Sequence, residues 1–136
     1  GKEKNIPYYM QVAKKLGLEK RVTFFGPRSN TTEFYQVADS LVIPSIYDPF
    51  ANVTVEALAM GLYVISSPYN GGKEVLNKGN GTVIADLKDP ELFAKALAKG
   101  LERPKTWASS QNIRESIKHL DFSNQLSTLL ESTLEP

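Results

Sequence analysis

Residues 40–67, SLVIPSIYDPFANVTVEALAMGLYVISS, decide the fold of this chain. Residues 40–45 and 62–67 are short, almost continuously apolar runs, which are typical of strands buried on both faces of a parallel sheet. The residues between them, 52–60, favour a helix, and Gly61 is placed to end it. A strand, a helix and a second strand in this order predict a parallel βαβ unit. We expect the strand at 40–45 to be central in its sheet.

The same alternation continues in both directions from this segment. Helical spacing of apolar residues and helix-ending glycines or helix-starting prolines mark the helices, and β-branched or aromatic runs mark the strands. The predicted helices cover residues 9–16, 31–39, 73–77, 90–101, 107–120 and 121–134, and the further predicted strands cover 21–26 and 81–85. The fold class is therefore α/β, with a doubly wound, Rossmann-like and mostly parallel sheet.

The composition of the chain indicates what kind of protein it is and which partners are unexpected. The chain has 136 residues, 41% of them hydrophobic and 23% charged, which suits one globular domain. A net charge of +1 provides no field that would hold nucleic acid, so we expect no nucleic-acid partner. The chain has no cysteine and no apolar run of about 20 residues, which fits a cytoplasmic protein with at most a peripheral membrane association.

The loop and helix that follow the strand at 40–45 hold the candidate site. Ligands of doubly wound sheets bind outside the carboxyl ends of the strands. Here the amides of Asn52, Val53 and Thr54 would open a helix, whose dipole favours an anion such as phosphate. Asp48 precedes these amides and Glu56 lies one turn into the helix, and carboxylates accept hydrogen bonds from sugar hydroxyls.

A purely structural interpretation of the same residues remains open. Acids near the first helical turn stabilise the helix dipole, Asp48-Pro49 is a common turn, and Asn52 is a good helix cap. His119, the sole histidine, is near the end of a predicted helix, and we assign it no role.

Taken as a whole, the segment resembles the signature of the family-4 retaining glycosyltransferases, in which an acid, seven residues and a glutamate follow a strand ending in Pro-Ser. The resemblance covers essentially the whole chain. The stretches that carry it are residues 21–28, 35–39, 44–61, 61–66, 71–74 and 80–84. It implies the nucleotide-sugar-binding, C-terminal half of a GT-B glycosyltransferase over residues 1–136, truncated at its N-terminus. The first strands and the acceptor-binding domain would be absent, so we expect this chain to be inactive by itself.

The resemblance assigns roles to individual residues. The catalytic residues would be Asp48, which binds hydroxyls of the transferred sugar, and Glu56, which binds the nucleotide ribose. Asp48 stands where the family usually has glutamate, so its carboxylate reaches one methylene less far, and Ala51 stands where the family usually has glycine. The full expected donor-binding set is Gly26, Arg28, Pro49, Phe50, Ala51, Asn52, Val53, Thr54 and Glu56, with Gly71, Gly72 and Glu74 added at the crevice mouth. Arg28 could equally be a surface charge, and the two glycines could serve the backbone alone.

The implied activity is transfer of a hexose from a UDP- or GDP-sugar to a glycan or lipid-linked acceptor. Neither a metal nor another cofactor is expected, because the family neutralises the leaving diphosphate with basic groups and helix amides. Residues 47–50 and 67–72 most resemble the lipopolysaccharide core glucosyltransferase I group, which points to lipopolysaccharide or another surface glycan. The alternatives are a glycogen- or sucrose-type synthase and a non-catalytic nucleotide-binding module. A dehydrogenase is disfavoured, because no Gly-x-Gly-x-x-Gly joins a strand to a helix.

Overall fold

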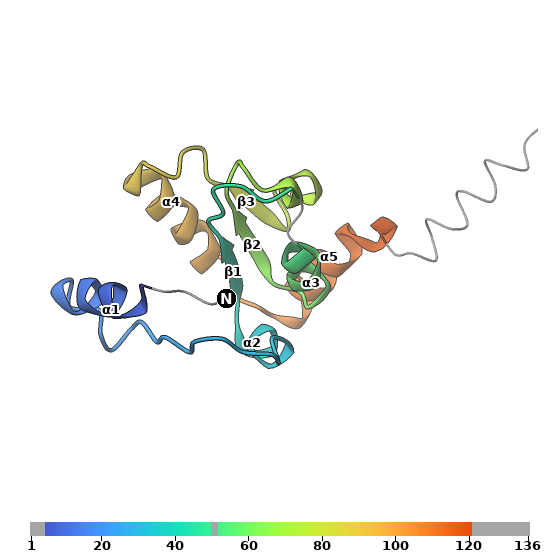
Figure 1. Ribbon diagram of the computed structural model, residues 1–136. Coiled ribbons are helices and arrows are strands. Elements are labelled where there is room, and N and C mark those ends of the chain that lie inside the picture. The colour runs from blue at the N-terminus through green and yellow to red at the C-terminus, as the bar shows by residue number, and fades with distance from the viewer. Residues whose placement is uncertain (1–4, 50–51, 121–136) are drawn as a thin grey trace, which may run out of the picture. The chain divides into compact units, whose positions relative to one another are not determined.

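A computed structural model describes residues 5–49 and 52–120, and it divides into two compact units (Figure 1). The first unit is Gly1–Glu33 and the second is Phe34–Pro136, and each is described by itself. The predicted helix at 121–134 lies outside the described residues.

The first unit contains one helix, α1 (Ile6–Lys15), which confirms the predicted helix at 9–16. Its end has a regular capping geometry in which Gly17 adopts a positive φ of 67°. The amide of Leu18 donates to the carbonyl of Ala13 over 2.8 Å, and the amide of Gly17 donates to that of Lys14 over 3.0 Å. These two bonds form a Schellman motif, so the sequence signal for the helix end is correct.

The prediction of a strand at residues 21–26 is wrong. This run belongs to no sheet of the described residues, and its side chains are exposed, including Val22 at 39% and Phe25 at 53%. A strand is held by hydrogen bonds to a neighbouring strand, and none within the described part of the chain pairs with this run. Strand propensity without such a partner therefore leaves an exposed segment, which turns at Gly26 with a φ of 66°.

The second unit is built on three parallel strands, β1 (Ser40–Ile43), β2 (Tyr63–Ser66) and β3 (Gly81–Val83), in the order β1-β2-β3. Helix α3 (Asn52–Ala59) joins β1 to β2, which confirms the predicted βαβ unit. The expectation that β1 is central is wrong, because β2 has partners on both sides and all four of its residues are buried. In the described sheet β1 lies at an edge and is mostly half-buried.

Helices cover both faces of this sheet. In Figure 1, α4 (Pro90–Leu101) lies on one face, and α3 and α5 (Trp107–Ser116) lie on the other. Asp89 caps α4 by accepting hydrogen bonds from the amides of Glu91 and Leu92, and Pro90 follows at the first helical position. The shorter elements are α2 (Thr32–Val37), η1 (Gly71–Val75) and η2 (Lys118–Leu120).

Two predicted helices differ from expectation by more than a shift of their ends. The helix predicted at 73–77 is the short 3-10 helix η1, which starts two residues earlier because Asn70 caps it. The helix predicted at 107–120 is divided at Ile117 into α5 and η2.

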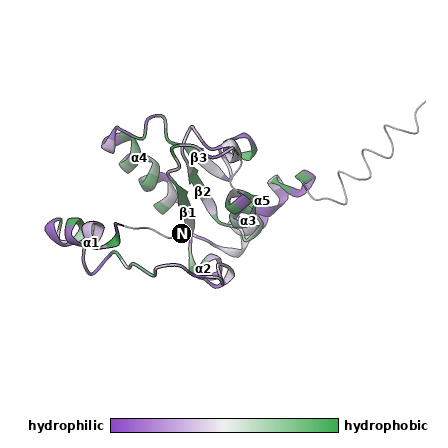
Figure 2. Ribbon diagram, viewed as in Figure 1, coloured by the Kyte–Doolittle hydropathy of each residue, from purple (hydrophilic) through white to green (hydrophobic). Residues whose placement is uncertain are grey.

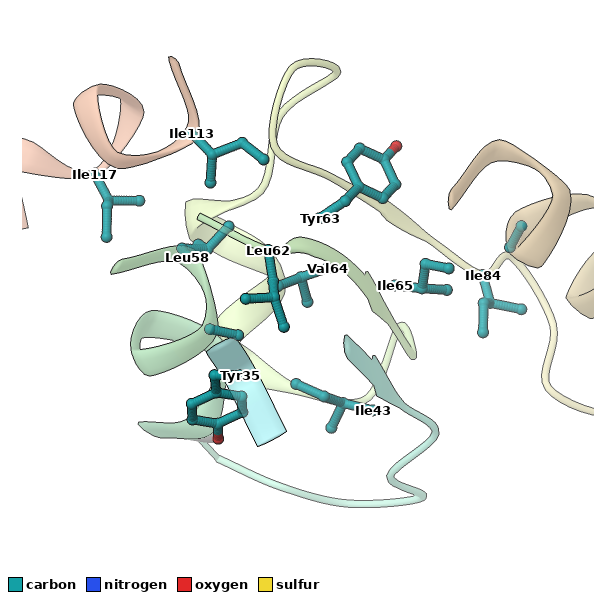
Figure 3. Close-up of a cluster of buried hydrophobic side chains, with 12 residues drawn as sticks. Tyr35, Ile43, Leu58, Leu62, Tyr63, Val64, Ile65, Ile84, Ile113 and Ile117 are labelled. Atoms are coloured by element: carbon teal, nitrogen blue, oxygen red, sulfur yellow. The ribbon is translucent and has the colours of Figure 1, made fainter. Parts of the chain in front are cut away.

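The hydrophobic core lies on both sides of β2. Figure 3 shows Val64 directed toward Leu58 and Leu62 on the α3 side, whereas Ile65 lies beside Ile84 on the opposite side. Alternate residues of a strand point to opposite faces, so β2 supplies apolar side chains to both helical layers. Figure 2 shows β1 as mainly hydrophobic, while the helices carry both hydrophobic and hydrophilic residues.

Gly61 joins α3 to β2 at a tightly packed point. Its φ is 75°, and the amides of Gly61 and Leu62 donate to α3 carbonyls over 2.9 Å each, so it ends α3 as predicted. A β-carbon at this position would lie 2.5 Å from the β-carbon of Ser110 in α5. Glycine therefore provides the backbone conformation and also the space in which α5 packs.

Candidate functional site

The loops that follow β1 and β2 lie side by side at the carboxyl edge of the sheet. The amide of Asp48 donates to the carbonyl of Tyr69 over 3.2 Å, and the amide of Gly71 donates to the carbonyl of Asp48 over 2.9 Å. Asp48 and Asn70 thus form an isolated parallel bridge beyond the ends of the strands. The backbone around Asp48 is fixed to the neighbouring loop, as a binding loop on a rigid scaffold requires.

Ser67, the first residue after β2, links the same two loops through its side chain. Its side chain is fully buried, and its hydroxyl donates to the carbonyl of Ser45 over 2.6 Å and accepts from the amide of Tyr69 over 3.2 Å. The amide of Ser67 donates to the carbonyl of Ile43 over 3.0 Å. Ser67 therefore connects the loop after β1 to the loop after β2. Its amide, hydroxyl and carbonyl each take part in a hydrogen bond.

Asn70 joins η1 to the first turn of α3 through a buried polar cluster. Its side-chain amide nitrogen donates to the hydroxyls of Ser66 (3.0 Å) and Thr54 (3.4 Å), and its oxygen accepts from the amide of Gly72 (2.9 Å). Asn70 and Thr54 are fully buried. A β-carbon on Gly72 would overlap the Thr54 side chain, so this glycine is needed for close packing.

The two predicted carboxylates occupy different settings at this edge. Asp48 is half-buried in the loop after β1, and Glu56 is exposed on α3. The hydroxyl of Tyr35, on α2, donates to Oε2 of Glu56 over 3.2 Å. Glu56 thus has a side-chain partner 21 residues away in sequence.

The beginning of α3 supplies the amides that we expected near an anion. Asn52 and Val53 are exposed, and the first amides of a helix have no acceptor within the helix. Thr54 is fully buried, and its hydroxyl accepts a hydrogen bond from the Asn70 side chain, so the exposed residues of this turn are Asn52 and Val53. Pro49 is exposed beside this turn, whereas Phe50 and Ala51 lie outside the described residues.

The remaining predicted residues are distributed between the two units. Gly71, Gly72 and Glu74 belong to η1, where Glu74 is exposed. Gly26 and Arg28 belong to the first unit, so they are described apart from the other site residues. There Arg28 is exposed, and its Nε donates to the carbonyl of Phe25 over 3.0 Å.

A lysine supports α2 from the segment between α4 and α5. Nζ of Lys105 donates to the carbonyls of Tyr35 (2.6 Å) and Gln36 (3.3 Å), and its backbone amide donates to Oδ1 of Asp39 (2.8 Å). Burial lowers the pKa of the Lys105 amine, the charge of Arg114 lowers it further, and Asp39 opposes this shift. These bonds hold the C-terminal end of the short helix that carries Tyr35.

Sequence reasoning missed the residues that fix this site from within. Tyr35 entered the prediction as part of a helical pattern and of the family resemblance, without a role at the site, and neither Ser67 nor the Thr54 side chain carried a local signal. The Asn-Gly-Gly sequence at 70–72 did offer one, because an asparagine side chain often caps the backbone two residues later. That bond is present between Asn70 and Gly72.

The described residues hold neither a metal-binding cluster nor a membrane-spanning helix. Across residues 5–49 and 52–120, no three histidine, aspartate or glutamate side chains gather as ligands of a metal ion. No helix in this described part of the chain is long and apolar enough to cross a membrane.

Comparison with known proteins places these features in a family. Residues 1–103 match the family model described as "Glycosyl transferases group 1". The D-inositol 3-phosphate glycosyltransferase of Corynebacterium glutamicum (strain R) is 34% identical over 100 residues, which are 72% of this chain and 24% of that protein. The lipopolysaccharide glucosyltransferase WaaG of Escherichia coli (strain K12) is 32% identical over 105 residues, or 76% of this chain and 28% of that protein.

Solved structures agree with the described fold. The crystal structure of WaaG, a glycosyltransferase involved in lipopolysaccharide biosynthesis, matches 85% of this chain and 32% of its own at 30% identity, with a TM-score of 0.72. The sucrose-phosphate synthase of Thermosynechococcus elongatus matches 98% of this chain and 37% of its own at 25% identity, also with a TM-score of 0.72. The chain spans about a quarter of the length of the curated relatives cited here. By its family match over residues 1–103, and by its structural similarity to part of a glycosyltransferase, this chain belongs to the group 1 glycosyl transferases.

Proposed function

We propose that residues 1–136 form the nucleotide-sugar-binding part of a retaining glycosyltransferase, which transfers a hexose from a UDP- or GDP-sugar to a glycan or lipid-linked acceptor. The observation that carries the proposal is the pair of joined loops at the carboxyl edge of the sheet, which hold Asp48 beside the first turn of α3. Parallel sheets of this class bind ligands at that edge.

Each part of the site suits one part of a nucleotide sugar. The amides of the exposed Asn52 and Val53 and the helix dipole suit the diphosphate. Asp48 suits hydroxyls of the transferred sugar, and the exposed carboxylate of Glu56 suits the ribose. Catalysis in this arrangement would come from stabilising the charge that develops on the leaving diphosphate.

The relatives support a nucleotide sugar as the donor and a glycan or lipid-linked acceptor. Two relatives are a D-inositol 3-phosphate glycosyltransferase and a lipopolysaccharide glucosyltransferase, and HepE of Anabaena has been solved with UDP and with UDP-glucose. From these relatives and residues 47–50 and 67–72, we propose a role in lipopolysaccharide or another surface glycan. The enzyme would act in the cytoplasm or peripherally at the inner face of the membrane.

A sucrose-type synthase is the second candidate, because the sucrose-phosphate synthase structure matches almost the whole chain. Since the chain spans about a quarter of its curated relatives, acceptor binding in either case would require protein beyond the donor site.

A thermal-shift experiment on the complete 136-residue chain tests the proposal. The ligands are UDP, GDP, ADP and their glucose or mannose conjugates, with inorganic diphosphate as a control for simple anion binding. A ligand at 100 times its dissociation constant stabilises the folded state by about 2.7 kcal/mol. We expect one uracil or guanine nucleotide to raise the melting temperature more than diphosphate does. A folded protein that responds to none of these nucleotides, or equally to diphosphate, would overturn the proposal.

A further inference from the structure

Glu56 is exposed, but its carboxylate is attached to the core of the protein through one hydrogen bond. We infer that Tyr35 is a positioning residue of the donor site, whose hydroxyl orients the Glu56 carboxylate toward the ribose of a nucleoside diphosphate. The inference rests on the proposed function of Glu56. It adds a residue on α2 to a site otherwise formed by α3 and the loops after β1 and β2.

The Tyr35 ring is well suited to act as an anchor. Its side chain is only 7% exposed and belongs to the hydrophobic core cluster, where Figure 3 shows it on the same side as Ile43 and Leu58. The hydroxyl reaches Oε2 of Glu56 over 3.2 Å. The apolar ring thus fixes the position of a polar group that meets an exposed carboxylate, which is a common use of a buried tyrosine.

The bond leaves Glu56 able to bind a ligand. An ionised carboxylate offers about four acceptor sites on its two oxygens, and Tyr35 occupies one of them. The remaining sites, including those on Oε1, can accept from two hydroxyls of a ribose. An exposed glutamate loses rotamer freedom when it binds, and a hydrogen bond that already restricts the side chain reduces this loss.

The backbone that carries Tyr35 is also held. Nζ of Lys105 donates to the carbonyls of Tyr35 and Gln36, and the amide of Lys105 donates to Asp39 just after α2. A helix of six residues has little stability by itself, so these bonds matter for its position. The ring, the hydroxyl and the backbone of Tyr35 are therefore all fixed before a ligand arrives.

Tyr35→Phe tests the inference, because it removes the hydroxyl and keeps the buried ring. Calorimetry on the intact protein would measure the affinities of UDP and GDP, each compared with its 2′,3′-dideoxy form. The expected loss for the ribose nucleotides is about three- to tenfold, which corresponds to one ordinary hydrogen bond. The dideoxy nucleotides should lose much less, because they lack the hydroxyls that Glu56 would bind.

The matched control is Tyr63→Phe. Tyr63 is also a buried core tyrosine, at 3% exposure, but it lies at the amino end of β2, where Arg103 stacks over its ring at 5.2 Å. Removing its hydroxyl should leave nucleotide affinity unchanged. A melting temperature for each variant separates a loss of stability from a loss of orientation.

A double-mutant cycle with Glu56→Gln separates the possible outcomes. If Tyr35 acts through the Glu56 carboxylate, Tyr35→Phe should weaken binding in the wild type and have little effect when Glu56→Gln is present. An equal effect in both backgrounds, or an equal effect on ribose and dideoxy nucleotides, would overturn the inference. Normal affinity in Glu56→Gln would instead refute the ribose role of Glu56, whereas loss in Glu56→Gln with normal affinity in Tyr35→Phe would refute only the role of Tyr35.

Discussion

The two edges of the same parallel sheet are held by different means. At the carboxyl edge, the fully buried polar side chains of Ser67, Asn70 and Thr54 connect the loops after β1 and β2 to η1 and α3. At the amino edge, Gly61 packs directly against Ser110, and Arg103 stacks over Tyr63. The carboxyl edge therefore fixes the positions of loop backbones, and the amino edge fixes how α5 packs.

This difference teaches how a binding edge can be rigid without being apolar. A buried polar group must be hydrogen-bonded, so each bond from Ser67 or Asn70 specifies one loop position. The contacts at the amino edge join α5 and the segment before it to the sheet, and they hold no residue of the candidate site. We therefore expect substitutions at the amino edge to change stability first, and substitutions at the carboxyl edge to change ligand handling as well.

The largest effect should come from Gly61→Ala at the amino edge. Alanine at a φ of 75° is strained, and its β-carbon would lie 2.5 Å from that of Ser110. Together the strain and the overlap should lower the free energy of unfolding by about 3 kcal/mol or more, measured by urea denaturation. Gly17→Ala is the control, because Gly17 has a similar φ of 67° but nothing within 4 Å of its added β-carbon. Equal losses in the two variants would show that packing against Ser110 contributes nothing.

Asp48→Asn should give the next effect and should separate chemistry from binding. Its proposed partner is the sugar, so in the full-length enzyme the variant should slow the hydrolysis of UDP-glucose or a GDP-hexose by water, to nucleoside diphosphate and free hexose, by about 10- to 100-fold. This range corresponds to one lost charge-assisted hydrogen bond. UDP or GDP affinity should change much less than in Glu56→Gln. The sugar role of Asp48 is untenable if the bare nucleotide loses affinity as strongly as the rate falls.

Asn70→Ala tests the buried cluster at the carboxyl edge. The change leaves the Gly72 amide and the hydroxyls of Ser66 and Thr54 without this partner, and it should destabilise the protein by about 1–3 kcal/mol. Nucleotide affinity should also fall, because η1 loses its connection to the first turn of α3. Asn77→Ala is the control, because the exposed Asn77 side chain caps only the amide of Gly79. A loss of stability with unchanged affinity would confine Asn70 to a structural role.

The smallest expected effect is the contribution of Lys105 to the pH dependence of the unfolding free energy. Burial lowers the pKa of its amine in the folded protein below the ordinary value of 10.5. Between these two values the unfolded chain binds more protons than the folded one, so this residue adds stability as pH rises toward 10.5. The difference in unfolding free energy between wild type and Lys105→Met should therefore move slightly in favour of the wild type across this range. A constant difference would show that the pKa of Lys105 is not lowered.

Much of the fold could be predicted because its signals are local. The helix ends at Gly17 and Gly61, the helix start at Pro90 and the apolar runs of β1 and β2 depend on residues close in sequence, and all are present. The strand predicted at 21–26 failed because its composition carries no information about a hydrogen-bonding neighbour. The placement of β1 in the centre failed for the same reason, since a run of apolar residues does not reveal how many partners a strand has.

The sequence was enough to predict the βαβ unit, and it places the candidate site, with Asp48 and Glu56 as its proposed acids, at the carboxyl edge of the sheet. It could do so because periodicity, capping and chain direction depend on neighbouring residues. Only the tertiary structure decided that Tyr35 meets Glu56 across 21 residues, that Ser67 meets Ser45 across 22, and that Lys105 meets the end of α2 across 70. These contacts exist because packing the helices on the sheet brings distant side chains within hydrogen-bond distance, and no local pattern in the chain encodes that distance.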